Sequence, residues 1–259
     1  MLEHQIDDRG VVTLTLNRAE LHNAFDDLLI AELIKTLKLY EQNSKTRLLV
    51  LRSTGKSFSA GADLNWMKRV AQYSFAENKQ DAEQLAELMS CLYHFPSPTI
   101  AVVQGAAFGG GVGLVSCCDI AIASDKASFC LSEVKLGLVP AVISPYVIAA
   151  IGARQAQRYF LTAERFDAQT AFHLGLVQQL TSADSLEQAA DSLITTLLQN
   201  SPQALKACKK LIQDVDGAIN SQLRDMTTTL IAELRASPEG KEGLSAFLEK
   251  RPAGWLQHD

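Results

Sequence analysis

The order of apolar and polar positions predicts alternating strands and helices at the start of the chain. Residues 11–18 alternate β-branched or apolar side chains with polar ones, which is the pattern of a strand. Residues 26–43 begin with acidic side chains and repeat leucine and isoleucine at helical spacing, with Leu28 and Leu39 counted among the apolar positions. Residues 47–53 form a short continuous apolar run, as expected of a strand buried on both faces.

The same alternation continues through the middle of the chain. A polar amphipathic helix is predicted for residues 75–93, and a buried strand for residues 99–105. Further short apolar runs at 119–124 and 128–133 predict two more strands. Repeated strand–helix–strand units of this kind indicate an α/β core.

From about residue 145 the chain has a helical pattern, interrupted by one strand-like stretch at 176–180. No internal repeat, low-complexity tract or flexible linker separates this part from the rest. We therefore expect an α/β core over residues 1–195 and a helical C-terminal region over residues 196–259.

Composition and charge narrow the class of protein. The chain has 259 residues, 47% hydrophobic and 20% charged, which is typical of a soluble globular protein with a substantial core. The net charge of −5 argues against a nucleic-acid binder held by phosphate contacts. Apolar runs are broken well before membrane-spanning length, and no basic-then-apolar leader opens the chain. We expect a cytoplasmic protein that binds neither nucleic acid nor membrane.

Neither the cysteines nor the histidines suggest a metal site. The five cysteines are odd in number and contain no C-x-x-C, which favours small core residues in a reducing compartment. The five histidines show no ligand spacing. We therefore expect no metal.

Two segments rich in small residues each follow a predicted buried strand: KSFSAGADL at 56–64 and QGAAFGGGVGL at 104–114. The second lacks the Lys-Ser/Thr of a phosphate-binding loop, and its spacing fits a dinucleotide fingerprint poorly. It could be a turn that packs two elements closely. Alternatively, each turn could aim a free backbone N–H at one carbonyl oxygen, which is the geometry of an oxyanion hole.

Several segments together resemble the enoyl-CoA hydratase/isomerase (crotonase) family, in the family's order from about residue 5 to 256. They are LNRAELHNAF, KSFSAGADL, AVVQGAAFGGGVGLVSCCDIAIAS, SFCLSEVKLGLVP and EGKEGLSAFLEKRPAGW. The resemblance implies an α/β fold, a spiral of β-β-α units with a helical C-terminal trimerisation region. It also implies a homo-oligomer, a trimer or a dimer of trimers. The implied substrate is an acyl-CoA, with coenzyme A as part of the substrate and no separate cofactor.

The resemblance also implies the site residues. The backbone N–H groups of Ala62 and Gly110 match the family's oxyanion donors, and Glu133 matches a catalytic glutamate. Glu133 is at the end of the strand predicted for 128–133, between Leu131 and Val134, where burial should raise its pKa toward the range useful in acid–base catalysis. The expected substrate contacts are Ala24, Ala60, Asp63, Leu64, Phe108, Ser132 and Lys250, the last reaching a CoA phosphate from a neighbouring subunit.

The chain departs from the family pattern at Gly113, where many family hydratases carry a first catalytic glutamate. One carboxylate can move a proton between two carbons, as an isomerase requires, or deprotonate water and then protonate the α-carbon. The leading hypothesis is a hydratase, and a Δ3,Δ2-enoyl-CoA isomerase is the alternative. A non-catalytic acyl-CoA binder or an RNA-binding relative is a third; RNA binding would need a basic stripe, and the one dense basic cluster is KACKKL at 206–211.

Within the family, the segments SAGADLNWM and CLSEVKLGLVPAVISPYV resemble those of bacterial 3-methylglutaconyl-CoA and carboxygeranoyl-CoA hydratases. Such substrates carry a second carboxylate, and the candidate cations near the site in sequence are Lys68, Arg69 and Lys135. Trp66, Met67 and Tyr146 could shape the acyl site, but core packing is the simpler role for each.

Overall fold

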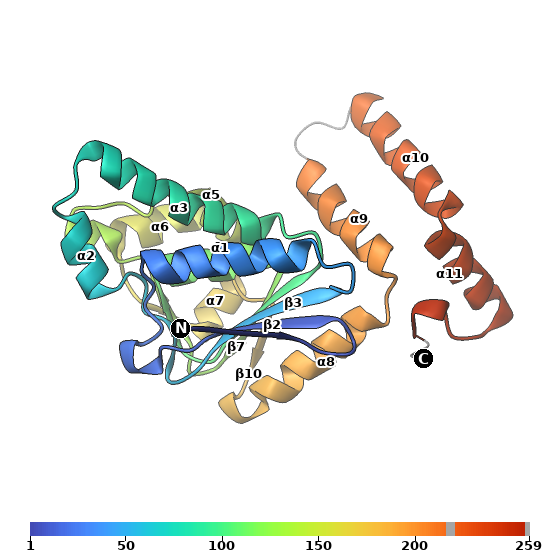
Figure 1. Ribbon diagram of the computed structural model, residues 1–259, viewed down its shortest axis with the longest axis horizontal. Coiled ribbons are helices and arrows are strands. Elements are labelled where there is room, and N and C mark those ends of the chain that lie inside the picture. Colours follow the sequence, from blue (N-terminus) through green and yellow to red (C-terminus); the bar gives the residue numbers. More distant parts are fainter. Residues whose placement is uncertain (216–220, 257–259) are drawn as a thin grey trace. The chain divides into compact units, whose positions relative to one another are not determined.

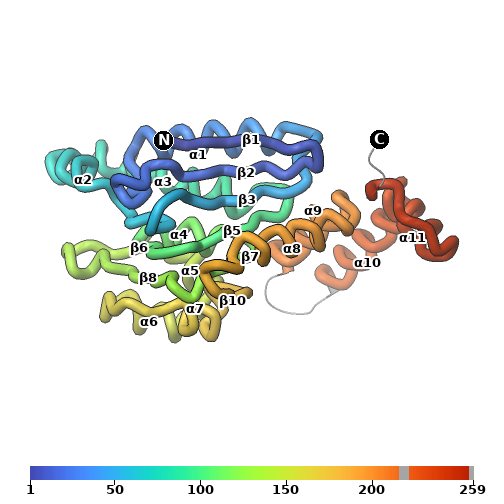
Figure 2. The backbone as a smooth tube through the Cα atoms, turned by 90° about the horizontal axis from the view of Figure 1, so that it is seen from below, coloured from blue at the N-terminus to red at the C-terminus, as the bar shows by residue number. Residues whose placement is uncertain are grey.

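The larger of two units is built on a six-stranded sheet. The computed structural model describes residues 1–215 and 221–256, in one unit formed by 1–95 with 99–191 and another formed by 96–98 with 192–259. The strand order is β1-β2-β3-β5-β7-β10, and Figure 2 shows the strands from β1 to β7 following one another. β1 runs antiparallel to β2, and the other pairs are parallel. The strands are β1 (Leu2–Ile6), β2 (Val11–Leu16), β3 (Leu48–Ser53), β5 (Thr99–Val103), β7 (Ile120–Ser124) and β10 (Gln179–Thr181).

A second, four-stranded sheet in the same unit has the order β4-β6-β8-β9. Its strands are β4 (Ser57–Ser59), β6 (Ala106–Phe108), β8 (Ser128–Cys130) and β9 (Phe166–Asp167). β4, β6 and β8 run parallel to one another, so their C-terminal ends lie at the same edge of the sheet. The segments that follow these three strands are therefore brought together although about 70 residues separate the first from the last along the chain.

Helices bury the apolar faces of the sheets. α1 packs against α3, and α4 packs against both α3 and α5; Figure 1 shows α1 and α3 side by side. The helices that begin in this unit are α1 (Asp27–Glu41), α2 (Leu64–Val70), α3 (Phe75–Tyr93), α4 (Gly110–Cys117), α5 (Ser144–Ile151), α6 (Ala153–Thr162), α7 (Ala168–Leu174) and α8 (Leu186–Leu198). Three short 3-10 helices span Ala19–Leu21, Glu133–Leu136 and Ala183–Ser185.

The α/β class and most long elements agree with the pattern in the sequence. The amphipathic helix predicted at 75–93 is α3, with the same bounds. The assignment of Leu28 and Leu39 to the apolar face of α1 is wrong, because they are 63% and 57% exposed. The buried stripe of α1 runs through its other apolar positions, Leu29, Ile30, Leu33, Ile34, Leu37 and Tyr40. β4, β6 and β9 were not predicted, because runs of two or three residues carry too little periodicity.

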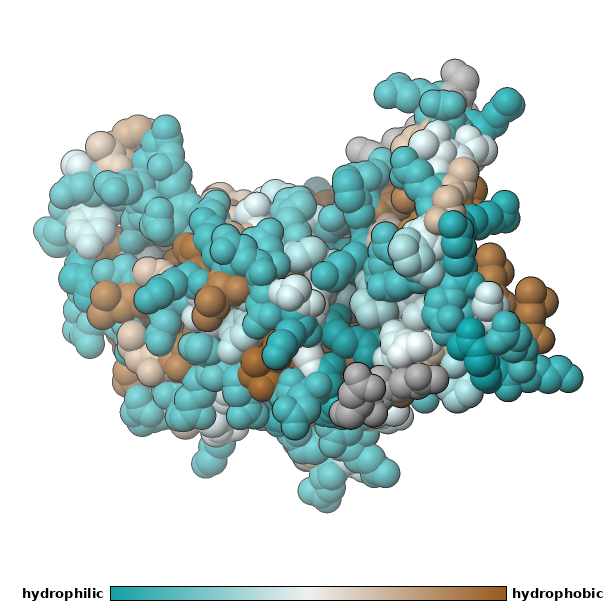
Figure 3. Space-filling model, turned by 45° about the vertical axis from the view of Figure 1, so that its right-hand side comes forward, coloured by the Kyte–Doolittle hydropathy of each residue, from teal (hydrophilic) through white to brown (hydrophobic). Residues whose placement is uncertain are grey.

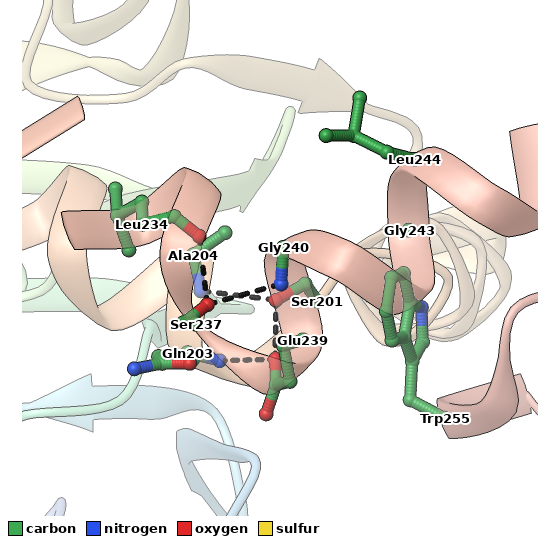
Figure 4. A pocket seen from close by; sticks show the side chains of 10 residues that line it. All are labelled: Ser201, Gln203, Ala204, Leu234, Ser237, Glu239, Gly240, Gly243, Leu244 and Trp255. Atoms are coloured by element: carbon green, nitrogen blue, oxygen red, sulfur yellow. Dashed lines mark hydrogen bonds between the residues drawn. The ribbon is translucent and has the colours of Figure 1, made fainter. Parts of the chain in front are cut away.

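The smaller unit consists of helices, two of which begin with the same kind of N-terminal cap. It contains α9 (Pro202–Asp214), α10 (Ser221–Ala236), α11 (Pro238–Glu249) and a 3-10 turn (Gly254–Leu256). Ser201 and Ser237 each precede a proline and cap α9 and α11 by accepting from a backbone N–H. The Glu239 carboxylate accepts from the Ser201 hydroxyl and from the backbone N–H of Gln203, so the starts of the two helices are linked (Figure 4).

The Ser201, Ser237 and Glu239 side chains around the pocket in Figure 4 take part in these caps, and its apolar lining includes Leu234, Leu244 and Trp255. The division of roles between residues 1–195 and 196–259 stays a prediction.

Figure 3 shows a face of the molecule that is mainly hydrophilic with small hydrophobic groups. Among the described helices, none has the length and apolar character needed to cross a bilayer.

The loop between β2 and α1 is fixed by one buried side chain, Asn23. Its amide nitrogen donates to the carbonyl oxygens of Thr54 (2.7 Å) and Ser57 (2.8 Å), and its Oδ1 accepts from the backbone N–H of Arg18 (2.8 Å). His22 and Asn23 both have positive φ, a conformation that asparagine tolerates better than most residues. This loop lies against β4 and carries Ala24 and Phe25 toward the edge where the second sheet ends.

Replacing Asn23 with alanine should therefore cost stability. Loss of three buried hydrogen bonds and of a residue suited to positive φ should lower the free energy of unfolding by about 3 kcal/mol. Urea denaturation followed by circular dichroism measures this change. As a control, Asn78→Ala on exposed α3 should shift the free energy by no more than about 0.5 kcal/mol. Equal effects of the two substitutions would contradict the role given to Asn23.

Candidate active site

The segments that follow β4, β6 and β8 are in contact with one another. A Cβ atom added to Gly61 would lie 3.0 Å from the carbonyl oxygen of Phe108, and one added to Gly111 would lie 2.7 Å from that of Ser59. A Cβ added to Gly109 would lie 3.2 Å from the Oε1 atom of Glu133. The structure therefore brings the SAGADL turn, the triple-glycine turn and Glu133 to one place.

The backbone N–H of Ala62 is left free by the way its turn is held. Phe25 and Ala62 form an isolated parallel bridge, in which the N–H of Phe25 donates to Gly61 O (2.9 Å) and the N–H of Asp63 donates to Phe25 O (3.0 Å). In an extended segment, successive peptide groups point in opposite directions, so the Ala62 N–H faces away from Phe25. It has no acceptor within residues 1–215 and 221–256.

The backbone N–H of Gly110 is free for a different reason. Gly110 is the first residue of α4, and the first N–H groups of a helix have no partner within the helix. The preceding Gly109 has φ 50° and ψ −119°, a conformation that glycine adopts readily, which lets α4 start directly after β6. No acceptor for the Gly110 N–H occurs in the described part of the chain. Helix start and helix dipole both favour an oxygen with negative charge here.

Gly110 also has no room for a side chain. A Cβ at this position would lie 2.1 Å from Cζ of Phe25 and 2.9 Å from its Cε2. The end of the Phe25 ring thus touches the Gly110 backbone, which explains why glycine stands at this position.

Glu133 is a half-buried carboxyl group at the same edge. It begins the 3-10 helix after β8, and its Oε2 atom is buried without a hydrogen-bond partner among the described residues. Burial raises the pKa of the Glu133 carboxyl above its ordinary value, and a hydrogen bond from the residue's own backbone N–H offsets part of this. A buried, unpartnered carboxyl oxygen is costly, and such groups concentrate at functional sites.

No second carboxylate can stand where Gly113 is without rearrangement. A Cβ on Gly113 would lie 2.4 Å from Cγ2 of Ile143 and 3.3 Å from Cε of Met89. The space that a glutamate side chain would need is filled by apolar groups. Position 113 therefore does not supply a second carboxyl group to act with Glu133.

The substrate contacts expected from the sequence differ in how the structure uses them. Ala24 is buried, and its carbonyl oxygen accepts from Arg18 (3.2 Å). Ala60 is exposed beside the turn, and Leu64, at the start of α2, is 74% exposed. Asp63 is 7% exposed and caps α2 by accepting from two backbone N–H groups, so its carboxylate has a structural task. Its expected contact is accordingly through the backbone.

The remaining expected contacts fall in two places. Phe108 ends β6, and Ser132 directly precedes Glu133; both are half-buried at the edge of the second sheet. The guanidinium of Arg165 lies over the Phe108 ring, 4.7 Å from its centroid. Lys250 is an exposed residue at the end of α11 in the other unit, and its expected contact with coenzyme A stays a prediction.

The cations considered for a second substrate carboxylate also differ. Arg69 forms an ion pair with Asp27 on α1. Lys68 and Lys135 are exposed, and Lys135 belongs to the 3-10 helix that begins with Glu133. Trp66, expected to pack, is 6% exposed, and Tyr146 is half-buried against Tyr93. No cluster of three or more histidine, cysteine or acidic side chains suited to a metal occurs among the described residues.

Sequence reasoning missed Arg18, whose side chain joins the caps of two helices next to the site. Its guanidinium contacts the Asp26 carboxylate (2.9 Å) and the Asp63 carboxylate (3.4 Å), and all three side chains are largely buried. Asp26 caps α1 and Asp63 caps α2, so one cation joins the starts of both helices on either side of the Phe25–Ala62 bridge. The sequence contains no signal for this contact, because Asp63 lies 45 residues away from Arg18.

Comparisons with known proteins agree on the kind of protein. The Enoyl-CoA hydratase/isomerase family matches residues 7–258. The crystal structure of an enoyl-CoA hydratase from Shewanella pealeana is 51% identical, with a TM-score of 0.95, over 98% of this chain and 95% of that one. A trans-2-decenoyl-acyl-carrier-protein isomerase from Streptococcus mutans is 31% identical over 94% of both chains. A 2,3-dehydroadipyl-CoA hydratase from Escherichia coli is 33% identical over 93% of both.

Burial of Glu133 predicts a pH-dependent cost to stability. Because the pKa is raised in the folded state, the folded protein binds more protons than the unfolded chain between the ordinary and the raised pKa. The carboxyl group therefore costs no stability below the ordinary glutamate value, and its cost grows as pH rises through the raised value. A Glu133→Gln variant lacks this titration.

The measurement is the melting temperature of wild type and Glu133→Gln across that pH range. The melting temperature of wild type minus that of Glu133→Gln should fall as pH rises from the ordinary glutamate pKa and level off above the raised pKa. The exposed Gln80→Ala, which removes no titratable group, serves as the control, and its difference from wild type should stay flat. A difference for Glu133→Gln that does not change with pH would contradict the desolvated carboxyl.

Proposed function

Because the chain belongs to the enoyl-CoA hydratase/isomerase family, we propose that it is a hydratase that adds water across the double bond of an α,β-unsaturated acyl-CoA. One observation supports this above the others: the partnerless carboxyl oxygen of Glu133 lies beside the turns that carry two backbone N–H groups without acceptors. A group that moves protons and a pair of donors for a developing oxyanion are what this addition requires.

The proposed reaction uses these groups in one sequence. The thioester oxygen accepts from the N–H groups of Ala62 and Gly110, which draws electrons from the double bond toward the carbonyl. The Glu133 carboxylate takes a proton from water, and the water oxygen bonds to the β-carbon as the C=C electrons move to form an enolate. The enolate oxygen gains negative charge against the two N–H groups. Glu133 then returns its proton to the α-carbon, the carbonyl re-forms, and the carboxylate is regenerated.

A single carboxyl group constrains the stereochemistry. Since Glu133 both receives the proton of water and delivers a proton to the α-carbon, the hydroxyl group and the hydrogen enter from the same face of the acyl chain. The apolar groups around Gly113 leave no room for a second carboxyl group at that position. Raising the pKa of Glu133 suits both halves of the step, because a group with pKa near the working pH can take and release a proton readily.

The second candidate is a Δ3,Δ2-enoyl-CoA isomerase that uses the same three groups. The absence of a carboxylate at Gly113 favours it, because an isomerase needs one group that carries a proton between two carbons. The Streptococcus mutans relative is named as an isomerase, so both activities occur among similar proteins. The named hydratases among the relatives, at comparable or higher identity, support hydration as the first proposal.

The acyl group of the substrate and the oligomeric state of the protein are further parts of this proposal. The E. coli relative is named for 2,3-dehydroadipyl-CoA, the thioester of a dicarboxylic acid. Lys135 is the nearest candidate in sequence to pair with a second carboxylate here, because Arg69 is paired with Asp27. A methylglutaconyl-type substrate, a trimer or dimer of trimers, and a contact of Lys250 with CoA from a neighbouring subunit remain predictions that accompany this proposal.

The ultraviolet absorbance of the conjugated thioester distinguishes the two candidate reactions. With a 2-enoyl-CoA as substrate, the hydratase proposal predicts loss of the ultraviolet absorbance of the conjugated thioester and appearance of a 3-hydroxyacyl-CoA. The panel includes short straight-chain, branched and ω-carboxyl 2-enoyl-CoA esters. Formation of conjugated absorbance from a 3-enoyl-CoA, with no hydration of any 2-enoyl ester, would overturn the hydratase in favour of the isomerase.

Turnover should depend on Glu133 and on its ionised form. Glu133→Gln should lower kcat by at least ~10²-fold, the scale of a lost general acid/base. In wild type, kcat/KM should fall as pH drops through a pKa above the ordinary glutamate range, because the carboxylate must be ionised to take the proton of water. Steady-state rates across pH test both points. Glu83→Gln is the control, and unchanged turnover in Glu133→Gln would place the chemistry elsewhere.

A further inference from the structure

One residue, Phe25, contacts both of the turns whose N–H groups are free. Its backbone forms the bridge on either side of Ala62, through Gly61 O and Asp63 N–H. Its ring end touches the Gly110 backbone, at 2.1 Å from the place of an added Cβ. Phe25 is itself 2% exposed, so it belongs to the buried core beside the two turns.

We propose that Phe25 is a positioning residue that sets the separation and direction of the two oxyanion N–H donors. This rests on the proposed function, because it concerns the site at which a thioester oxygen would bind. The backbone of Phe25 fixes the plane of the peptide at Ala62, and its rigid ring limits how closely the start of α4 can approach. The two donors come from turns 48 residues apart in sequence, and Phe25 bridges them directly.

The ring is held firmly from behind. Phe25 packs on Trp66 of α2, with ring centroids 6.5 Å apart, and the Trp66 indole N–H donates to Asp81 Oδ1 on α3 (3.0 Å). Trp66 is itself 6% exposed. A buried aromatic ring packed against Trp66 acts as a spacer of constant length, whereas a flexible chain of similar volume would not.

The backbone of Phe25 is held as firmly as its ring. Arg18 binds the Ala24 carbonyl and the Asp26 carboxylate, which are the groups directly before and after Phe25. The same guanidinium reaches Asp63, the residue after Ala62. The bridge between Phe25 and Ala62 is therefore closed by an ion pair at its end, and the position of the Ala62 N–H follows from that of Phe25.

The test separates positioning from general packing by using Phe25→Leu with Phe95→Leu as the matched control. Both phenylalanines are buried in the same unit, at 2% and 1% exposure, and no Phe95 atom is among the nearest neighbours of a Cβ added to Gly61, Gly109 or Gly110. Two readouts are measured on folded protein, checked by circular dichroism: kcat and KM with the best 2-enoyl-CoA, and the absorption maximum of a bound 4-aminocinnamoyl-CoA. Polarisation of that probe's carbonyl by the two N–H groups moves its absorption to longer wavelength.

Phe25→Leu should lower kcat by ~10²-fold with KM changed by no more than about threefold, because the donors act mainly on the transition state. It should also lose most of the wavelength shift of the bound probe. Phe95→Leu should keep the shift and most of kcat. Where Phe25→Leu does not fold, Phe25→Met, whose longer unbranched side chain matches leucine in volume and also lacks the rigid ring, should show the same loss.

Equal kcat and equal shift in Phe25→Leu and Phe95→Leu would overturn the spacer role while leaving the proposed function intact. Glu133→Gln separates the two further, since it should lose turnover but keep the shift. A wild-type protein that neither turns over any acyl-CoA nor shifts the probe would overturn the proposed function and the spacer role together.

Discussion

The parallel pairing of β4, β6 and β8 is the constraint from which the rest of the site follows. Each strand is only three residues long, yet their pairing places residues 60–63, 109–110 and 131–133 at one edge of the sheet. Without it, two peptide groups and a carboxyl group from three distant parts of the chain would have no reason to meet. The larger sheet and its helices supply the buried core on which these short strands depend.

The groups left unsatisfied at the site lower the stability of the fold. Two N–H groups without acceptors and a buried carboxyl oxygen without a donor each cost stability, so the fold must offset them elsewhere. The compensation lies next to the site: Asn23 satisfies the loop before Phe25, and Arg18 joins the caps of α1 and α2. These contacts orient the site without facing it. Groups left unsatisfied in this way are prepared to interact with a substrate oxygen and a proton.

The sequence predicted the parts of this account that depend on local pattern. Long periodic segments such as α3 were assigned from their spacing, and the two glycine-rich turns stood out because each follows an apolar run. The family resemblance then named Ala62, Gly110 and Glu133. The structure adds contacts that a sequence pattern does not contain. In the sequence Phe25 is only the last residue of the segment LNRAELHNAF, whereas in the structure its ring lies against Gly110. Arg18 and Asp63 meet across 45 residues, and contacts at that separation leave no trace in periodicity.

The central claim is that the N–H groups of Ala62 and Gly110 bind the same thioester oxygen, with the carboxyl of Glu133 beside it. A crystal structure of the protein with a saturated acyl-CoA tests this most directly. The account predicts one carbonyl oxygen at roughly 2.7–3.1 Å from both backbone nitrogens, the range of an oxyanion hole. It also predicts a Glu133 carboxyl oxygen next to the α- and β-carbons of the acyl chain. A thioester oxygen out of hydrogen-bonding reach of either nitrogen would contradict it.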